Sequence, residues 1–273
     1  MSKIKDKHQR FVADSHYLGL KMLGENYREI IDKANGSNAG YFDFISDIIF
    51  SEARQKQKRR IDYLVKNSRL PQPTKIIGDF DFNFQPKLNR KLVMDLATMD
   101  FIEKGDSILF IGDVGTGKSH IAQSLAGLAC QHGHKVYYTT CSDLINDLNA
   151  GVYEKTLDKR IKKYINPQLL VIDEMGHDRL ELQIVKEAHL LFKVIDQRYS
   201  ASKPLIFTTN IEEIDWPEFL GDAISSAAIL DRIFHHSVIV RINGPSYRKY
   251  QGELLQKRYK QSKEAKAEKP ETG

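Results

Sequence analysis

The feature that most constrains this chain is a glycine-rich stretch between an apolar run and a helical pattern. Residues 112–119 fit the spacing G-x-x-x-x-G-K-[ST], the apolar run 108–111 precedes them, and residues 121–129 have the pattern of a helix. Glycine lets the backbone turn with positive φ and approach a ligand closely, and N–H groups at a helix N-terminus attract anions. The stretch therefore predicts a phosphate-binding loop, which comprises Gly112, Asp113, Val114, Gly115, Thr116, Gly117, Lys118, Ser119 and His120.

Two side chains of this loop have roles that follow from the motif. The ammonium group of Lys118 is expected between the β- and γ-phosphates of a nucleotide, and the Ser119 hydroxyl is expected to bind Mg²⁺. A glycine-rich turn without a ligand is the alternative. Because strand and helix patterns flank the loop in the right order, we favour a nucleotide-binding loop over a turn without a ligand. We therefore expect ATP and Mg²⁺ as cofactors.

The middle of the chain alternates strand and helix patterns. A helix is expected just before the phosphate loop, at 88–103, and further helices separate the apolar strands. Such alternation is typical of an α/β fold, in which a parallel sheet carries helices on both faces. The strands predicted in addition to 108–111 cover residues 135–140, 169–174, 205–210 and 238–242.

Polar residues end two of these strands, at the edge where open α/β sheets bind ligands. Asp173 and Glu174 end one strand, and Asn210 ends the next. We expect Asp173 to hold Mg²⁺ directly or through water, and Glu174 to act as the base that polarises the attacking water. Asn210, with Thr209 beside it, is expected to orient that water or to sense the γ-phosphate.

Phosphoryl transfer often recruits an arginine that neutralises the charge developing in the transition state. Spacing alone does not choose among the candidates, for each of which a surface ion pair is the alternative. They are Arg198, Arg232, Arg241 and Arg248.

The charge distribution suggests a domain organisation. Residues 1–70 hold 14 Lys/Arg against 9 Asp/Glu and read as helical, whereas 71–247 hold 19 against 23. We expect a helical N-terminal domain at 1–70 that binds DNA or a partner, and a nucleotide-binding domain at 71–250. The latter begins with an extended linker arm at about 71–86, and a basic, disordered tail follows at 251–273.

Basic residues crowd one or two turns of a helix predicted in the first domain. Like charges this close repel one another, so the cluster is typical of a surface that a polyanion neutralises. A solvated helix face is the alternative. The residues that we expect to contact DNA phosphates here are Arg54, Lys58, Arg59 and Arg60.

Other classes of protein are not indicated. The chain has neither an apolar run long enough for a membrane span nor the apolar region of a signal peptide, so we expect no membrane partner and a cytoplasmic location. Cys130 and Cys141 lack metal-ligand spacing and are expected to be buried, reduced thiols.

Several short blocks of this sequence are distinctive in their order and spacing. They are Phe80-Asp-Phe-Asn-Phe-Gln-Pro86, Leu96-Ala-Thr98, Phe101-Ile-Glu103, Gly115-Thr-Gly-Lys-Ser-His120, Leu170-Val-Ile-Asp-Glu174, Thr208-Thr-Asn210, Leu230-Asp-Arg-Ile-Phe-His-His236 and Ser246-Tyr-Arg248. With these blocks the chain resembles the IstB family of ATP-binding helper proteins of insertion sequences, which are AAA+ ATPases of the initiator and helicase-loader clade alongside the loader DnaC. The resemblance covers about residues 5–250. One departure is Asp113-Val114, where the family usually has two prolines.

The resemblance implies an AAA+ P-loop core and an ATP-dependent homo-oligomer, in a ring or helix, with ATP between subunits. Arg232 would be the arginine finger that acts on a neighbour's ATP, and Arg248 the second sensor arginine within the same subunit. Members of the family assemble on duplex DNA with ATP, deform it, and recruit and stimulate the transposase encoded alongside. ATP hydrolysis drives disassembly and helps in the choice of target site.

The resemblance also implies an insertion after the second strand, at about 142–166. Its basic residues could line a DNA groove and contact phosphates, with a solvated helix face as the alternative. Two other functions stay open: a DnaC-like replicative helicase loader that prefers single strands, and a nucleotide-switched binding protein with negligible turnover. The insertion residues expected to contact DNA are Lys159, Arg160, Lys162 and Lys163.

Overall fold

A computed structural model of the protein describes residues 2–37, 40–175, 184–217 and 223–267. The chain divides into two compact units, residues 1–63 and 64–273. This division lies inside a helix, a few residues before the boundary near residue 70 that we expected from composition.

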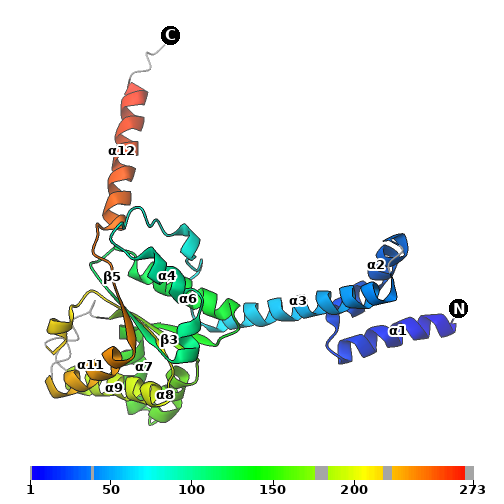
Figure 1. Cartoon of the computed structure of the whole chain (residues 1–273), viewed down its shortest axis with the longest axis horizontal. Helices are drawn as coiled ribbons and strands as arrows, with labels where there is room; N and C mark the ends of the chain where they lie inside the picture. The colour runs from blue at the N-terminus through cyan, green and yellow to red at the C-terminus, as the bar shows by residue number, and fades with distance from the viewer. Residues whose placement is uncertain (1, 38–39, 176–183, 218–222, 268–273) are drawn as a thin grey trace. The chain divides into compact units, whose positions relative to one another are not determined.

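The first unit is helical in the residues described (Figure 1). It contains α1 (Ser2–Tyr17), α2 (Lys21–Ser37) and most of α3 (Tyr41–Asn67). The ring of Tyr27 on α2 packs 5.2 Å from the ring of Phe11 and 5.6 Å from that of His8, which fixes α2 on α1. The buried Glu52 of α3 accepts a hydrogen bond from the backbone N–H of Leu23 at 2.6 Å. Ring contacts, the hydrogen bond to Glu52 and a hydrogen bond between the Tyr27 hydroxyl and Nδ1 of His8 at 3.1 Å therefore join these helices.

The second unit is built on a sheet in which all strand pairs are parallel. The strand order is β2-β3-β4-β1-β5, so the first strand in the chain lies between β4 and β5. Burial on both faces explains why the strands are apolar throughout rather than alternating. The predicted parallel α/β sheet is thus confirmed. The strands are β1 (Ser107–Ile111), β2 (Val136–Thr140), β3 (Leu169–Met175), β4 (Leu205–Thr209) and β5 (Ser237–Arg241).

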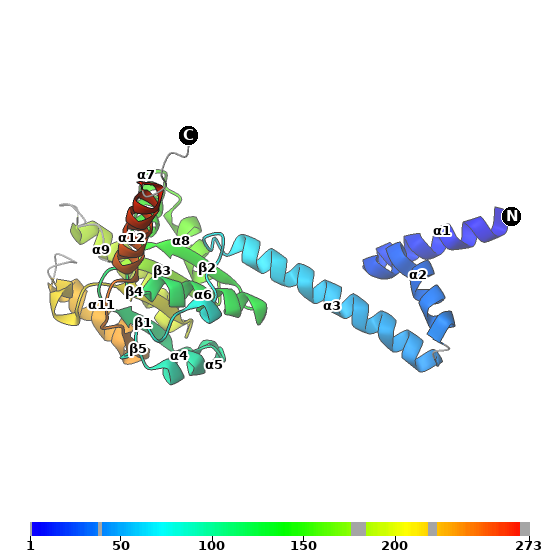
Figure 2. The same cartoon turned by 90° about the horizontal axis from the view of Figure 1, so that it is seen from above.

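Helices cover both faces of this sheet (Figure 2). On one face α4 (Arg90–Leu96), α5 (Asp100–Lys104) and α6 (Lys118–Gln131) enclose a core with Ile108 and Phe110. The core of the other face holds the alternate strand residues Leu109 and Ile111. The helices on that face are α7 (Cys141–Tyr153), α8 (Leu157–Ile165), α9 (Ile184–Ser200) and α11 (Ala223–His235).

Three expectations about local structure are corrected. The helix predicted over 88–103 is interrupted, because Met99 takes a left-handed backbone (φ 69°) between α4 and α5. The linker arm is not extended throughout, since it contains the 3-10 turn η1 (Ile77–Asp79); a second such turn, η2 (Glu213–Asp215), follows β4. The tail that we expected to be disordered is helical through residue 267, as α12 (Tyr247–Ala267), and residues 268–273 lie outside the described residues.

The remaining expectations on composition concern cysteines and membranes. Cys130 and Cys141 are buried and form no disulfide, as expected. Among the helices described, none is long and apolar enough to cross a membrane.

Candidate nucleotide site

The predicted phosphate loop joins the end of β1 to the start of α6, and its glycines are required by the backbone and by close packing. Gly115 and Gly117 have φ values of 83° and 103°, which disfavour residues with a side chain. A Cβ on Gly117 would lie 2.5 Å from the ring of Phe80. The linker arm therefore closes over the loop so tightly that only glycine fits beneath it.

Lys118 is held by the carbonyl groups of its own loop. Its ammonium group donates to the carbonyl oxygens of Gly112 at 2.6 Å and of Asp113 at 2.8 Å. Burial lowers the pKa of Lys118, the nearby Arg248 lowers it further, and the carboxylates of Asp173 and Asp113 oppose this shift. A half-buried cation whose hydrogen-bond partners are neutral carbonyls is well placed to gain from an incoming phosphate.

Asp173 lies at the end of β3 with 2% of its surface exposed, and its carboxylate accepts several hydrogen bonds. Oδ1 accepts from the Ser119 hydroxyl at 2.8 Å, from the Glu174 N–H at 3.1 Å and from the Thr208 hydroxyl. Oδ2 accepts from the Tyr138 hydroxyl. The two predicted metal ligands, Ser119 and Asp173, are therefore in direct contact.

This pair fits Mg²⁺ in its chemistry. Mg²⁺ prefers oxygen ligands and is usually bound by one or two protein groups, with water and substrate phosphates completing its shell. A hydroxyl and a carboxylate at the N-terminus of α6, next to Lys118, offer that donor set. The described residues contain no cluster of three or more His, Cys, Asp or Glu side chains, so a site made of protein ligands alone is not indicated in them.

Glu174 is exposed where its neighbour Asp173 is buried, because the strand is irregular at this point. The register of β3 against β4 shifts between Ile172 and Met175, and Glu174 takes a left-handed backbone with φ 58°. Its N–H is held by the Thr208 hydroxyl at 3.0 Å. The bulge separates two adjacent carboxylates, one buried and one presented to solvent, which is compatible with the different roles predicted for them.

A pocket of about 520 Å³, here called the main pocket, lies in front of the loop. Residues 114–120, Glu174 and Asn210 line it, together with Phe80 and Arg248. Gly112 and Asp113 do not line it and instead supply the carbonyls that hold Lys118. Most of the residues that the motif and the strand ends predicted for catalysis, cofactor binding and sensing therefore lie close together. Arg232 is the exception.

Aromatic side chains of the linker arm and of α12 form the far wall of the main pocket. The Phe80 ring meets those of Phe82 and His120 edge-on, with centroids 4.9 and 5.4 Å apart. Phe84 packs edge-on against Tyr247, at 5.0 Å. The aromatic residues of the arm therefore pack on the phosphate loop and on α12.

A second hollow of about 760 Å³, the side pocket, adjoins the main pocket. The two share Ser119, Gln123, Glu174 and Arg248, and the side pocket also reaches Asp173. The carboxylate of Glu174 is therefore accessible from two directions.

The four candidate arginines have different surroundings. Arg198 is fully buried, and its guanidinium donates to carbonyls including that of Tyr164 at 2.8 Å and that of Pro204 at 2.7 Å, which excludes it as a mobile finger. Arg241 pairs with Glu213 at 2.6 Å. Of the four, Arg248 is the one that lines the main pocket as described; the N–H of its neighbour Tyr247 donates to the Gly115 carbonyl at 2.9 Å.

Arg232 does not reach the nucleotide site of its own subunit. It pairs with Asp196 at 2.7 Å, and its guanidinium lies 4.8 Å from the ring centroid of Phe192. Its side chain keeps 28% of its surface exposed. Any action on ATP by Arg232 would therefore have to be in another subunit.

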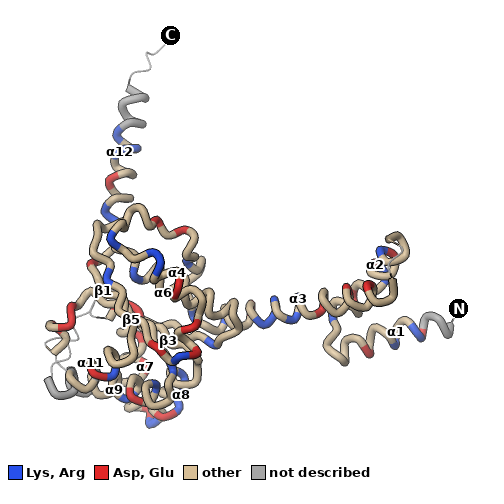
Figure 3. The backbone as a smooth tube through the Cα atoms, viewed as in Figure 1, with Lys and Arg blue, Asp and Glu red and all other residues tan. Residues whose placement is uncertain are grey.

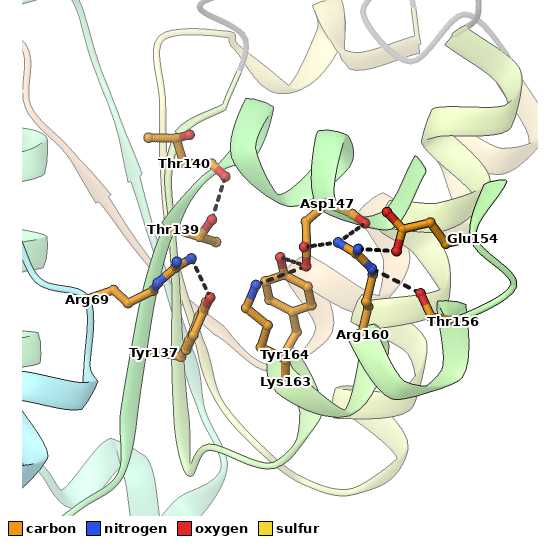
Figure 4. A network of polar contacts seen from close by, with 10 residues as sticks. All are labelled: Arg69, Tyr137, Thr139, Thr140, Asp147, Glu154, Thr156, Arg160, Lys163 and Tyr164. Atoms are coloured by element: carbon orange, nitrogen blue, oxygen red, sulfur yellow. Dashed lines mark hydrogen bonds and ion pairs between the residues drawn. The ribbon is translucent and has the colours of Figure 1, made fainter. Parts of the chain in front are cut away.

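The predicted DNA contacts divide into exposed and engaged side chains. In α8, Arg160 pairs with Asp147 at 2.5 Å and with Glu154 at 2.7 Å, and Lys163 pairs with Asp147 at 3.0 Å (Figure 4). Lys159 and Lys162 of the same helix are exposed. Lys159 and Lys162 therefore remain candidates for DNA contact. Arg160 and Lys163 instead join α8 to α7.

The basic cluster of the first unit lies along α3 (Figure 3). Arg54, Lys58 and Arg60 are exposed, whereas Arg59 is partly buried and lies 3.9 Å from Glu52. Most of the cluster is thus exposed on the surface of α3.

Two residues of the site were missed by sequence reasoning, which assigned the polar end of β4 to Asn210 and Thr209. Thr208 contacts Asp173, Thr209 donates to the Met175 carbonyl at 2.9 Å, and Asn210 lines the main pocket. Tyr138 was placed in a strand without a role. The signal that could have found it is a tyrosine in a buried strand, because a buried phenol requires a partner for its hydroxyl.

Comparison with known proteins identifies the family. The IstB-like ATP-binding protein family matches residues 13–254. The chain belongs to this family. It is 36% identical over 249 residues to a protein described as an ATP-binding protein of insertion sequence IS5376 from Geobacillus stearothermophilus, covering 91% of this chain and 95% of that protein. A similar protein of insertion sequence IS232 from Bacillus thuringiensis subsp. berliner is 31% identical, over 90% of this chain and 96% of that protein.

Solved structures agree on the fold. DnaI matches with a TM-score of 0.53 and 16% identity, over 64% of this chain and 95% of that chain. AMPPCP-bound DnaA from Aquifex aeolicus matches with a TM-score of 0.52 and 18% identity, over 68% and 56%. The second unit thus shares its fold with DnaI and DnaA, and the family to which the chain belongs is one of ATP-binding proteins.

Proposed function

We propose that this protein is a Mg²⁺-dependent ATPase that assembles on duplex DNA and recruits and stimulates the transposase of an insertion sequence. The observation that carries the ATPase is the convergence of Lys118, Ser119, Asp173 and Glu174 where the main and side pockets meet. Each matches a step that phosphoryl transfer needs: Lys118 and Ser119 begin α6, and Asp173 and Glu174 lie near the end of β3.

The roles follow from the surroundings of each side chain. Lys118 exchanges the loop carbonyls for the β- and γ-phosphates, and the contact between Ser119 and Asp173 orients the hydroxyl. Ser119 and Asp173 would hold Mg²⁺, which would neutralise part of the negative charge of the phosphates. Glu174, exposed on its bulge, accepts the proton of the attacking water, and Asn210 across the pocket orients that water.

The position of Arg232 supports an oligomer with ATP between subunits. In the Arg232–Asp196 ion pair the two side chains are 28% and 39% exposed. Such a pair contributes at most about 1 kcal/mol to stability, so it can open without a large cost. The side pocket leaves Glu174 open to a neighbouring subunit. We place the Arg232 of one subunit against the ATP of the next, and Arg248 on ATP within the subunit.

For DNA, the exposed basic residues of α3 and of α8 are the proposed contacts. They carry charge without an arrangement that reads base edges, which fits phosphate contacts and low sequence preference. In the first unit these are Arg54, Lys58 and Arg60, with Arg59 partly buried; in the insertion they are Lys159 and Lys162.

The ATPase is tested by steady-state release of phosphate with Mg²⁺ and with EDTA. We expect Mg²⁺-dependent turnover that the Lys118→Ala protein lacks. A matched control is Lys162→Ala, which removes an exposed lysine outside both pockets. Turnover that survives Lys118→Ala, or a parent protein that binds ATP without turning it over, would contradict the catalytic assignment.

A DnaC-like helicase loader is the second candidate, because DnaI shares the fold. It predicts a preference for single strands and capture of a replicative helicase. Binding to duplex DNA without a helicase would count against it.

A further inference from the structure

The carboxylate of Asp173 is held on one oxygen by a residue that the roles above do not use. Among the described residues, Oδ1 accepts from Ser119, Thr208 and the Glu174 N–H, whereas Oδ2 accepts from Tyr138. A carboxylate has about four lone-pair positions, two on each oxygen. Oδ1 is thus fully engaged, and Oδ2 keeps one position for a metal ion or its water while the phenol fixes the other.

Tyr138 is itself fixed at both ends. Its ring lies in the core between the sheet and α6 and is 8% exposed, so its rotamer is set by packing. Its backbone N–H donates at 2.7 Å to the carbonyl of Ser68, at the end of α3, which secures this outer strand of the sheet. The side-chain amide of Gln123 donates to the phenol oxygen at 3.3 Å.

These contacts direct the phenol proton towards Asp173. A hydroxyl that already accepts a hydrogen bond from an amide is a stronger donor, because chains of hydrogen bonds polarise one another. The carboxylate oxygen can only accept, so the phenol is the donor in this hydrogen bond. Asp173 therefore has a neutral hydrogen-bond donor on the oxygen that keeps one position for the metal.

We propose that Tyr138 is a positioning residue for the divalent cation: it orients the Asp173 carboxylate through Oδ2 and so sets the affinity of the site for Mg²⁺. This proposal rests on the proposed ATPase function. Outer partners of ligating carboxylates typically contribute about tenfold to hundredfold in metal affinity or activity. The residue acts on the metal, so affinity for nucleotide without metal should not depend on it.

The neighbouring tyrosine provides a matched control. Tyr137 lies on the same strand but on the opposite face, where its hydroxyl accepts from Arg69 at 2.8 Å and its ring meets that of Tyr164 at 5.4 Å (Figure 4). Removing either hydroxyl deletes one buried phenol oxygen from β2. The hydroxyl of Tyr138 contacts Asp173, whereas the recorded partner of the Tyr137 hydroxyl is Arg69.

The experiment is a titration of Mn²⁺ into the full-length protein with β,γ-methylene ATP, with free Mn²⁺ followed by electron paramagnetic resonance. Mn²⁺ is the probe because it takes the same oxygen ligands as Mg²⁺ and is detected directly. We expect Tyr138→Phe to raise the Mn²⁺ dissociation constant about tenfold to hundredfold, and Tyr137→Phe to leave it unchanged. Binding of the nucleotide in EDTA should be equal in all three proteins.

Each outcome separates the inference from the proposed function. If the parent protein binds no Mn²⁺ with nucleotide, the proposed ATPase itself fails. If the parent binds it and folded Tyr138→Phe binds it equally well, the role of Tyr138 is refuted. Should Tyr138→Phe not unfold cooperatively on heating, Gln123→Met gives the same measurement: a smaller weakening of Mn²⁺ binding is expected, and an unchanged dissociation constant would overturn the proposal.

Discussion

Replacing Gly117 by Ala tests whether the linker arm closes the phosphate loop. The residue has φ 103°, and an added Cβ would lie 2.5 Å from Cε2 and 3.1 Å from Cζ of Phe80. The substitution should therefore lower the free energy of unfolding in two ways: it strains the backbone of the loop, and it displaces the ring above it. Because the second depends on Phe80, a double-mutant cycle can separate them.

The magnitude can be worked out from these contacts. A residue with a side chain in a left-handed backbone costs about 1–2 kcal/mol. Moving the Phe80 ring off its partners adds about 1 kcal/mol, of the order of one aromatic pair. We expect Gly117→Ala to lower the free energy of unfolding by about 2–3 kcal/mol in the parent, and by only about 1–2 kcal/mol in a Phe80→Ala background.

The assay is denaturant unfolding of the parent, both single variants and the double variant, with nucleotide affinity measured alongside. A coupling near 1 kcal/mol, with weaker nucleotide binding in both Gly117→Ala proteins, supports the closed arm. Gly127→Ala is the control: it lies in α6 without a positive φ, and its Cβ would meet Thr74 Cγ2 at 3.3 Å. Strict additivity of the two substitutions would refute the packing of Phe80 on the loop.

Three further predictions concern the site and its support. Glu174→Gln should bind ATP normally but lose about 10²–10⁴ in turnover, measured by phosphate release, and activity equal to the parent would remove the base assignment. Burial lowers the pKa of Lys118 in the free protein, and a bound phosphate should raise it. At an alkaline pH between the pKa values of the free and the bound protein, nucleotide binding should therefore be accompanied by proton uptake. Calorimetry in buffers of different ionisation enthalpy measures this uptake, which Lys118→Arg should abolish because its guanidinium stays charged. Arg198→Met should lower the free energy of unfolding by about 3 kcal/mol or more, since it leaves buried carbonyls such as that of Pro204 without donors; an unchanged unfolding midpoint would contradict that reading.

Much of the nucleotide site was predictable because its parts are local in sequence. The phosphate loop is one continuous stretch, and Asp173, Glu174 and Asn210 each follow an apolar strand whose end must lie at the ligand edge of a parallel sheet. The fold class follows from the same alternation. Pattern and spacing suffice where the chain itself sets the geometry.

The remainder depends on contacts between distant segments, which periodicity does not encode. The hydrogen bond from Tyr138 to Asp173 joins residues 35 apart, and the ion pair of Arg232 with Asp196 joins residues 36 apart. Arg160 looked like a DNA contact by charge alone, but its partners come from the preceding helix. Met99 interrupts a stretch that was predicted as one helix: its backbone is left-handed and its side chain is buried in the core.

The central claim, a nucleotide-controlled assembly on DNA, is tested most directly by sedimentation of the protein with a linear duplex of ordinary sequence, in ATP, in ADP and without nucleotide, over a salt series. We predict large complexes with ATP, few with ADP or without nucleotide, and affinity that falls steeply with salt because many phosphates are neutralised. Lys118→Ala should abolish the assembly in ATP. Duplex binding independent of nucleotide, or ATP-dependent binding of single strands and a helicase instead, would contradict this account.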